Sequence, residues 1–148
     1  MINCEFENGN KANLRHVVVD VIVVEKNKVL LVKRANHLES GGKYGLIGGY
    51  VDRDETIRDA VLREVEEETG YKVEIIRQLR VIDSPNRPGE NRQNVAFLFL
   101  AKPIKKVSEP DDESTEVKWF PLDKLPDKKD FAFDHYENIA WFRGVKND

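Results

Sequence analysis

Four glutamates lie within five positions of the stretch 63-REVEEETGY-71, at residues 64, 66, 67 and 68. Like charges three or four residues apart on a helix destabilise it by roughly 0.2–0.5 kcal/mol per pair, so this cluster needs something that offsets the repulsion. Grouped carboxylate oxygens are ligands of hard cations such as Mg²⁺, Mn²⁺ or Ca²⁺, and no histidine or cysteine adjoins them to favour zinc. The stretch therefore favours divalent-cation chemistry.

A helix that begins near Thr56 and ends near Gly70 is expected to position these glutamates. Thr56 and Asp59 have the spacing of a capping box, with aspartate in place of the more usual glutamate. Gly70 suits the left-handed conformation that ends many helices. The inward face of this helix is marked by its apolar residues, which are Ile57, Ala60 and Val61.

Three of the four glutamates fall in line with that apolar face: Glu64, Glu67 and Glu68. A solvated acidic face, the alternative interpretation, accounts only for Glu66, which points away from it. Burying a carboxylate costs several kcal/mol unless it is paired, and Arg63 can neutralise only one of them, by pairing with Glu67 one turn later. A bound cation is the simplest way to offset the remaining charge.

The pair Gly48-Gly49 precedes this helix and follows a short apolar segment around Leu46-Ile47. A simple turn would account for the pair, but glycine also lets the backbone approach a ligand closely, and the Gly48 carbonyl then becomes a further oxygen ligand. A Mg²⁺ ion held by few carboxylates keeps waters and recruits phosphate oxygens from its substrate. Phosphoryl or pyrophosphate chemistry is therefore expected here.

The remaining elements are mostly strands. Residues 16–24, HVVVDVIVV, form a β-branched run that predicts a buried strand, and a polar turn joins it to a second strand at 29–32. Later strands are predicted at three places, which are 73–82, 95–101 and 117–120. A helix is the alternative for the first of these, because it is rich in charge. A closing helix is expected from Asp134 onward.

Composition indicates one soluble globular domain spanning residues 1–148. The chain carries 24 Lys and Arg against 27 Asp and Glu, and its net charge of −3 argues against a broad nucleic-acid-binding surface. No apolar run approaches the roughly 20 residues of a membrane helix. The N-terminus lacks the apolar core of a signal peptide, and Cys4 is the single cysteine. We therefore expect a cytoplasmic protein without a membrane partner.

Gly49, Glu55 and the segment 63–71 together resemble the Nudix box of the Nudix hydrolases. Five residues separate Gly49 from Glu55, and seven more precede 63-REVEEETGY-71. Tyr71 stands where the family usually has an aliphatic residue. The resemblance implies an α/β (α+β) fold, the Nudix-type α/β/α sandwich with a mixed β-sheet. It also implies Mg²⁺- or Mn²⁺-dependent hydrolysis of a nucleoside diphosphate linked to another group X.

The resemblance also assigns roles to single residues. It implies that metal is held by one carbonyl and three carboxylates, those of Gly48, Glu64, Glu67 and Glu68. Arg63 would orient the carboxylates, and Glu55 would tie the preceding loop to the helix. A glutamate from a later loop serves many members as a ligand or general base, and Glu113 is the candidate here, with Glu116 second. The residues implied in catalysis are Glu64, Glu67, Arg63 and Glu113.

Substrate choice in the family lies outside the box. The segment 83–87 with Arg92, and the triplet Phe133-Asp134-His135, are similar to ADP-ribose and nucleotide-sugar pyrophosphatases, whereas Ile47 replaces a proline common in that branch. The residues expected to contact the substrate are Arg34, Tyr44, Arg87, Arg92 and His135. For Arg34, Tyr44 and His135 a purely structural role is the alternative. ADP-ribose or a nucleotide sugar is the leading substrate.

Two alternatives to that function are carried forward. A nucleoside triphosphate or the 5′ end of an RNA would be cleaved by the same site. A non-catalytic, nucleotide-sensing module with the same fold belongs to a different class, but such a module would tolerate loss of the carboxylates, and all of them are present here. The expected partners are a small-molecule nucleotide, no long nucleic acid and, as in many members of the ADP-ribose branch, a second copy in a homodimer.

Overall fold

The computed structural model describes residues 1–146. Its strands are β1 (Ile2–Glu5), β2 (Lys11–Leu14), β3 (Val17–Glu25), β4 (Lys28–Arg34), β5 (Tyr44–Gly45), β6 (Ile47–Tyr50), β7 (Tyr71–Ile82), β8 (Val95–Lys106) and β9 (Ser114–Pro121). Its helices are α1 (Ile57–Thr69), the short 3₁₀ helix η1 (Lys128–Asp130) and α2 (His135–Lys146). Within residues 1–146, none of these helices has the length and apolarity to cross a membrane.

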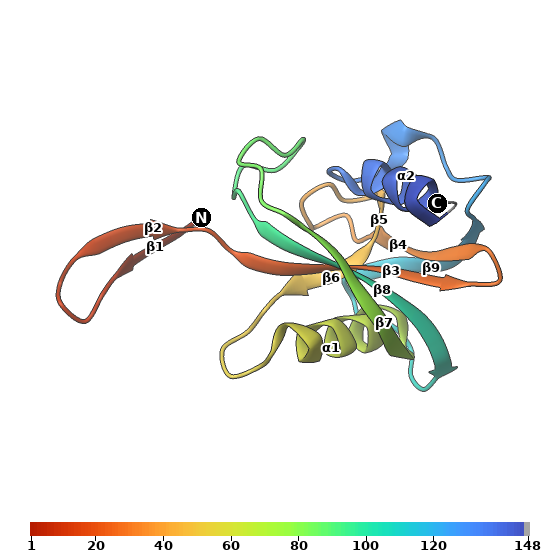
Figure 1. Cartoon of the computed structure of the whole chain (residues 1–148), viewed down its shortest axis with the longest axis horizontal. Helices are drawn as coiled ribbons and strands as arrows, with labels where there is room; N and C mark the ends of the chain where they lie inside the picture. The colour runs from red at the N-terminus through yellow and green to blue at the C-terminus, as the bar shows by residue number, and fades with distance from the viewer. Residues whose placement is uncertain (147–148) are drawn as a thin grey trace.

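A central sheet of seven strands separates α1 from α2 (Figure 1). Its path runs β5-β4-β3-β8-β7, with β6 also paired to β3 and β9 to β4. β3 and β8 are parallel, whereas the other pairs are antiparallel, so the sheet is mixed. Because each helix packs on its own face, the predicted α/β/α sandwich with a mixed sheet is confirmed.

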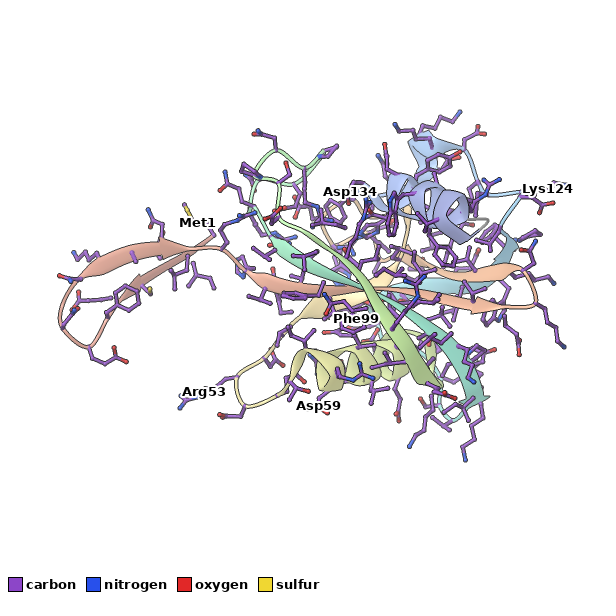
Figure 2. All side chains as sticks on the ribbon, in the orientation of Figure 1. Met1, Arg53, Asp59, Phe99, Lys124 and Asp134 are labelled. Carbon is purple, nitrogen blue, oxygen red and sulfur yellow. The ribbon has the colours of Figure 1, made fainter. Side chains whose placement is uncertain are left out.

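Strand β3 contributes to the hydrophobic layers on both faces of the sheet. Val19 and Val21 pack in the cluster that includes α1, whereas Ile22 packs in the cluster that includes α2, because successive strand residues point to opposite faces. Figure 2 shows Phe99 of the α1 layer between the sheet and that helix. Asp20 is the one charged residue in the stretch 17–24, and the alternation turns it toward the α2 side.

The sheet forks along one edge of β3. β6 pairs with β3 through residues 18–21, whereas β4 pairs with it only at Val24 and Glu25. Two strands therefore share this edge and diverge from it. The fork lets a single cavity reach both faces of the sheet, since its wall includes Gly49 near α1 and Leu46 on the α2 side.

The strands predicted in the second half of the chain are confirmed, and β7 shows that 71–82 is a strand and not a helix. Pairing with β8 along most of its length outweighs the charges of this segment. Three register shifts interrupt that pairing and mark bulges. The predicted hairpin of β3 and β4 turns at Lys26 and Asn27, whose positive φ values of 47° and 62° suit a tight two-residue turn.

An N-terminal hairpin of β1 and β2, which the sequence did not predict, projects from the sheet (Figure 1). The facing pairs Ile2–Leu14 and Cys4–Ala12 place apolar side chains on one face of this hairpin. Each strand has only four residues. An alternation this short gives too weak a periodic signal to predict a strand.

Helix α1 begins and ends as its sequence predicts. The Thr56 hydroxyl accepts a hydrogen bond from the Asp59 N–H, and the Asp59 carboxylate accepts one from the Thr56 N–H, each at 3.1 Å. Gly70 ends the helix in the left-handed conformation, at φ 75°. The Asp111 N–H donates to the Glu67 carbonyl at 2.8 Å. The last turn of α1 is therefore fixed to the loop that leads into β9.

Candidate active site

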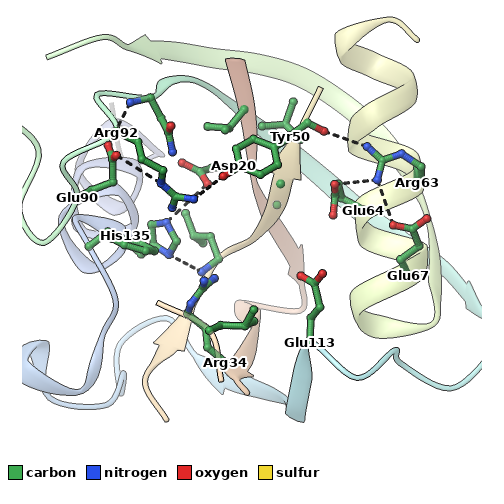
Figure 3. Close-up of a pocket in the computed structure, with 18 of the residues that line it drawn as sticks. Asp20, Arg34, Tyr50, Arg63, Glu64, Glu67, Glu90, Arg92, Glu113 and His135 are labelled. Carbon is green, nitrogen blue, oxygen red and sulfur yellow. Dashed lines mark hydrogen bonds and ion pairs between the residues drawn. The ribbon is translucent and has the colours of Figure 1, made fainter. Parts of the chain in front are cut away.

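A cavity of about 480 Å³ lies between α1 and the start of α2 (Figure 3). Glu64 and Glu67 of α1 line one end of it, and His135 at the start of α2 lines the other. Arg34, at the end of β4, and Arg92, in the loop before β8, line its sides. Acidic and basic side chains thus line the same cavity.

Arg63 organises the α1 end of the cavity. Its guanidinium holds the Glu55 carboxylate in a two-point contact, with Nη2–Oε1 at 2.6 Å and Nε–Oε2 at 3.0 Å. Nη1 also donates to Glu64 at 2.8 Å and to Glu67 at 3.1 Å, and Nη2 donates to the Tyr50 carbonyl at 2.9 Å. The hydrogen bonds to Glu55 are the main reason that the pKa of Arg63 is raised above its ordinary value. Arg63 is therefore permanently charged and orients three carboxylates.

Two of the α1 glutamates are buried. Burial raises the pKa of Glu64 and, with the nearby charge of Glu64, raises that of Glu68 well above its ordinary value. The Gly48 N–H donates weakly to Glu68 Oε2 at 3.4 Å. Gly49 lies directly against Glu64, since a Cβ on that glycine would fall 2.3 Å from Oε1. Glu67, with its side chain 50% exposed, remains at the cavity surface.

This donor set fits a hard divalent cation. All the groups are oxygens, two of the carboxylates are buried, and a glycine backbone adjoins them without an intervening side chain. Within the described residues no group of three or more acidic, histidine or cysteine side chains is already gathered for coordination. Arg63 holds Glu64 and Glu67 in hydrogen bonds, so both would exchange this partner for a cation.

The cavity brings together most of the residues expected from the sequence. Those that line it are Arg34, Gly48, Arg63, Glu64, Glu67, Arg87, Arg92, Glu113 and His135. Glu68 lies behind this wall, in contact with Gly48. Tyr44 lies elsewhere, because its hydroxyl donates to Glu116 at 2.9 Å and its ring packs edge-on against Phe120. The structure therefore does not place Tyr44 or Glu116 on the cavity wall.

Arg87 forms a buried ion pair at the far end of the cavity. Its Nη2 and Nε lie 2.7 and 3.0 Å from the two Asp134 oxygens, and Nη2 lies 3.5 Å from Asp20 Oδ2. Burial alone would raise the pKa of Asp134, but the hydrogen bonds and charge of Arg87 hold it below its ordinary value. Arg87 thus fastens the loop before β8 to the start of α2.

Arg34 and Arg92 meet at Glu39, in the loop after β4. The Arg92 Nη2 lies 2.9 Å from the Glu39 carboxylate, whereas the Arg34 Nε donates to the Glu39 carbonyl at 2.8 Å. Arg92 also donates to the Tyr50 hydroxyl, and the Arg34 guanidinium lies 5.3 Å from the centre of the Phe133 ring. Of the four cavity arginines, Arg34 alone has no carboxylate partner within residues 1–146.

His135 is buried and neutral. Its Nδ1 accepts a hydrogen bond from the Leu46 N–H at 3.0 Å, so the proton of the neutral ring is on Nε2. Nε2 lies 3.6 Å from Asp20 Oδ1. Burial lowers the pKa of this histidine, and the carboxylates of Asp20 and Asp134 only partly offset that effect. His135 joins the start of α2 to the residue that precedes β6.

Several residues of the wall were not expected from the sequence, including Asp20, Tyr50, Glu90, Asn94 and Phe133. Asp20 could have been predicted from the sequence, because a single charged residue inside an apolar strand must have a partner or a functional role. Phe133 adopts a positive φ of 51°, which is rare for a bulky residue. No local pattern in the sequence predicts this backbone conformation. The other positions lie in loops or at strand ends, where no periodic pattern points inward.

Comparison with known proteins gives a consistent result. The family model of the NUDIX domain matches residues 14–142. An ADP-ribose pyrophosphatase of Methanocaldococcus jannaschii is 35% identical over 131 residues, which is 88% of this chain and 75% of that protein. The human 8-oxo-dGDP phosphatase NUDT18 is 34% identical over 120 residues, but the matched region is 78% of this chain and only 35% of that protein.

Solved structures agree with the sequence relatives. A NUDIX hydrolase from Nitrosomonas europaea superposes with a TM-score of 0.71 at 30% identity, over 89% of this chain and 78% of that one. An ADP-ribose pyrophosphatase from Streptococcus suis gives a TM-score of 0.65 at 27% identity, over 76% of this chain and 78% of that one. The fold and the carboxylate helix define a Nudix hydrolase. The chain belongs to the NUDIX family, and the predicted resemblance is confirmed.

Proposed function

We propose that this chain hydrolyses the pyrophosphate bond of a nucleoside diphosphate linked to a group X, with ADP-ribose or a nucleotide sugar as the preferred substrate. The observation that carries this proposal is the juxtaposition of the α1 carboxylates with Gly48-Gly49 at one end of an arginine-bearing cavity. Relatives from an archaeon and a streptococcus that are called ADP-ribose pyrophosphatases support the choice of substrate.

Divalent metal ions are general cofactors of this family, and we propose Mg²⁺ or Mn²⁺ here. Glu64, Glu67 and Glu68 would hold the ion, assisted by the Gly48 carbonyl. When bound, such an ion polarises the diphosphate and lowers the pKa of a water molecule. The buried Glu68 gains most from it, since its only hydrogen bond within the described part of the chain is the 3.4 Å contact with the Gly48 N–H.

The remaining wall residues bind and orient the substrate. Arg34, without a carboxylate partner within residues 1–146, offers its charge to a phosphate oxygen, and Arg92 offers a second guanidinium. Glu113 lies on the cavity wall, and its charge contributes to raising the pKa of Glu64. We assign Glu113 as the base that accepts a proton from the attacking water. Arg63 orients Glu64 and Glu67 before the ion binds, and its two-point contact with Glu55 remains when they exchange it for the ion.

A screen of purified protein tests this function. ADP-ribose, nucleotide sugars, dinucleoside polyphosphates, nucleoside triphosphates and 5′-triphosphorylated RNA are incubated with Mg²⁺ or Mn²⁺, and phosphate release is measured through a coupled phosphatase. Hydrolysis of ADP-ribose or a nucleotide sugar that is absent from the Glu67→Gln protein is the expected result. Preference for triphosphates or RNA would overturn the substrate assignment. Inactivity on every compound would favour a nucleotide-sensing module.

Three further expectations stay predictions. The family model covers residues 14–142, and a single domain over 1–148 is proposed from chain length. A cytoplasmic location is proposed from composition and is tested by cell fractionation. A homodimer is proposed from the resemblance to the ADP-ribose branch, and light scattering of the purified protein measures it directly.

A further inference from the structure

Asp20 is a buried carboxylate that the pyrophosphatase chemistry does not use. Only 7% of the residue is exposed, and it lies within a strand that is otherwise apolar from Val17 to Val24. It faces the α2 side of the sheet, away from α1 and its glutamates. Burying an ionised carboxylate at this point is strongly unfavourable unless close partners offset the lost hydration.

The partners of Asp20 are distant. Arg87 Nη2 lies 3.5 Å from Oδ2, at the long limit of a hydrogen bond, and His135 Nε2 lies 3.6 Å from Oδ1. Arg87 makes its shorter contacts with Asp134, at 2.7 and 3.0 Å. An ionised carboxylate offers about four acceptor sites. Asp20 therefore retains the capacity to accept further hydrogen bonds, and it lines the cavity (Figure 3).

The surroundings of Asp20 decide which chemical group would fit. A phosphate would be repelled by the carboxylate. An ammonium group would meet the Arg87 guanidinium, which approaches the same oxygen. A hydroxyl suits both neighbours, because it donates to Asp20 while it accepts from an arginine N–H. The bonds that Arg87 makes to Asp134 and Asp20 use Nε and Nη2, and Nη1 carries two further N–H groups.

We infer that Asp20, held by Arg87 and His135, forms a hydroxyl-recognition subsite that selects substrates whose group X is a sugar. This inference rests on the proposed function and names the specificity residue for X. The cavity reaches Asp20 on the α2 side and Glu64 on the α1 side, so a diphosphate at the carboxylate end leaves X to extend toward Asp20. Leu46 and Phe133 on the same wall present apolar surface to the sugar ring.

Two substrates with five-carbon X groups, one hydroxylated and one not, test the subsite. ADP-ribose is compared with the pentyl ester of ADP, which keeps the diphosphate and the carbon count of X but has no hydroxyl on X, and AMP formation is measured. The wild-type kcat/KM should favour ADP-ribose by at least about tenfold, because a buried acceptor left without its donor disfavours the ester. In Asp20→Asn that preference should fall at least about fivefold, mainly through KM for ADP-ribose.

Asp134→Asn is the matched control. It removes the negative charge and one of the two acceptor oxygens that hold Arg87 but leaves the Asp20 acceptor in place, so the protein should lose stability while the substrate preference changes by less than about twofold. If both diphosphates are cleaved equally by the wild type, or if Asp20→Asn keeps the full preference, the inference is wrong while the proposed function stands.

A binding measurement tests the hydroxyl-recognition subsite if Asp20→Asn does not fold or if neither diphosphate is cleaved. Calorimetry compares ribose 5-phosphate with pentyl phosphate on the wild-type protein. Tighter binding of the sugar phosphate by at least about fivefold supports the subsite, because only that compound carries hydroxyls for Asp20. Equal affinities overturn it. Failure to cleave either diphosphate would count against the proposed function alone.

Discussion

The backbone of Gly49 lies against the carboxylate of Glu64, so closely that a Cβ would fall 2.3 Å from Oε1. The group in the way is the end of a flexible side chain, which can rotate aside. Gly49→Ala should therefore displace Glu64 and lower kcat/KM by at least about 100-fold, with a small change in melting temperature. A thermal melt and a turnover assay check both parts.

Two other glycines provide controls for that variant. A Cβ on Gly48 would fall 1.9 Å from the Val19 carbonyl, a backbone atom, so Gly48→Ala should lower the melting temperature markedly. A Cβ on Gly144 in α2 would meet no other side chain or distant backbone atom within 4 Å among residues 1–146, so Gly144→Ala should leave activity unchanged and slightly raise stability. Equal activity of Gly49→Ala and Gly144→Ala would contradict the assigned role of Glu64.

Millimolar Mg²⁺ should raise the melting temperature of the wild-type protein. A cation relieves repulsion among Glu64, Glu67 and Glu68 and binds only the folded state. A free ion at 100 times its Kd stabilises the fold by about 2.7 kcal/mol, which is readily detected. The shift should be much smaller in Glu64→Gln. An identical shift in wild type and variant would place the ion elsewhere.

Arg63→Lys should reduce kcat/KM by at least about tenfold. Lysine keeps the charge but cannot hold Glu55 at two points while also donating to Glu64 and Glu67. Arg58→Lys, at an exposed position of the same helix, is the matched control and should retain full activity. Retention of activity in both proteins would exclude Arg63 as the residue that orients the carboxylates.

Arg92 and Glu39 should have opposite effects on substrate affinity. Arg92→Ala removes a cation from the cavity and should raise KM more than it lowers kcat. Glu39→Gln frees Arg92 from its 2.9 Å ion pair and should lower KM for the same substrate, because the phosphate then competes only with the more distant Glu90, at 3.8 Å. Steady-state kinetics at low and high salt measures both changes. A rise in KM in both variants would show that the pair is only structural.

His135 should make stability depend on pH below about 6.5, the ordinary pKa of a histidine. Burial lowers its pKa in the folded state, so the unfolded chain binds a proton first as pH falls, and the free energy of unfolding decreases. The slope from this one group is at most about 1.4 kcal/mol per pH unit. Thermal melts from pH 7.5 to 5.0 should show a shallower loss in His135→Gln, whereas the exposed His37→Gln should match the wild type.

The carboxylate end of the cavity was predictable because its glutamates lie on one helix, and helical periodicity determines which way each of them points. The spacing of Thr56, Asp59 and Gly70 determined where α1 begins and ends, and Arg63 pairs with Glu67 as expected. Glu67 is more exposed than its position in line with Ile57 indicated, because the cavity opens beside it and removes the neighbours that would cover it.

At the opposite end Arg87 and His135 were expected on the wall, but their partners were not predictable, since these contacts join residues far apart in sequence. Asp20 meets His135 and Arg87 only because β3 lies at the fork beside the start of α2. Tyr44 was expected either to contact the substrate or simply to pack, and parallel bridging of its backbone to Phe131 and a hydrogen bond to Glu116 hold it in the α2 layer. Local sequence patterns predict neither the contacts of Asp20 nor those of Tyr44.

The division of the core into two hydrophobic clusters, one under α1 and one under α2, has a consequence for how this protein could diverge in evolution. The groups assigned to bond cleavage rest on the first cluster, whereas Asp20, His135 and Leu46 rest on or beside the second. Substitutions that are far apart and share no partners are close to additive. A lineage could therefore acquire a new preference for X by mutations behind α2 and inherit the hydrolytic helix unchanged.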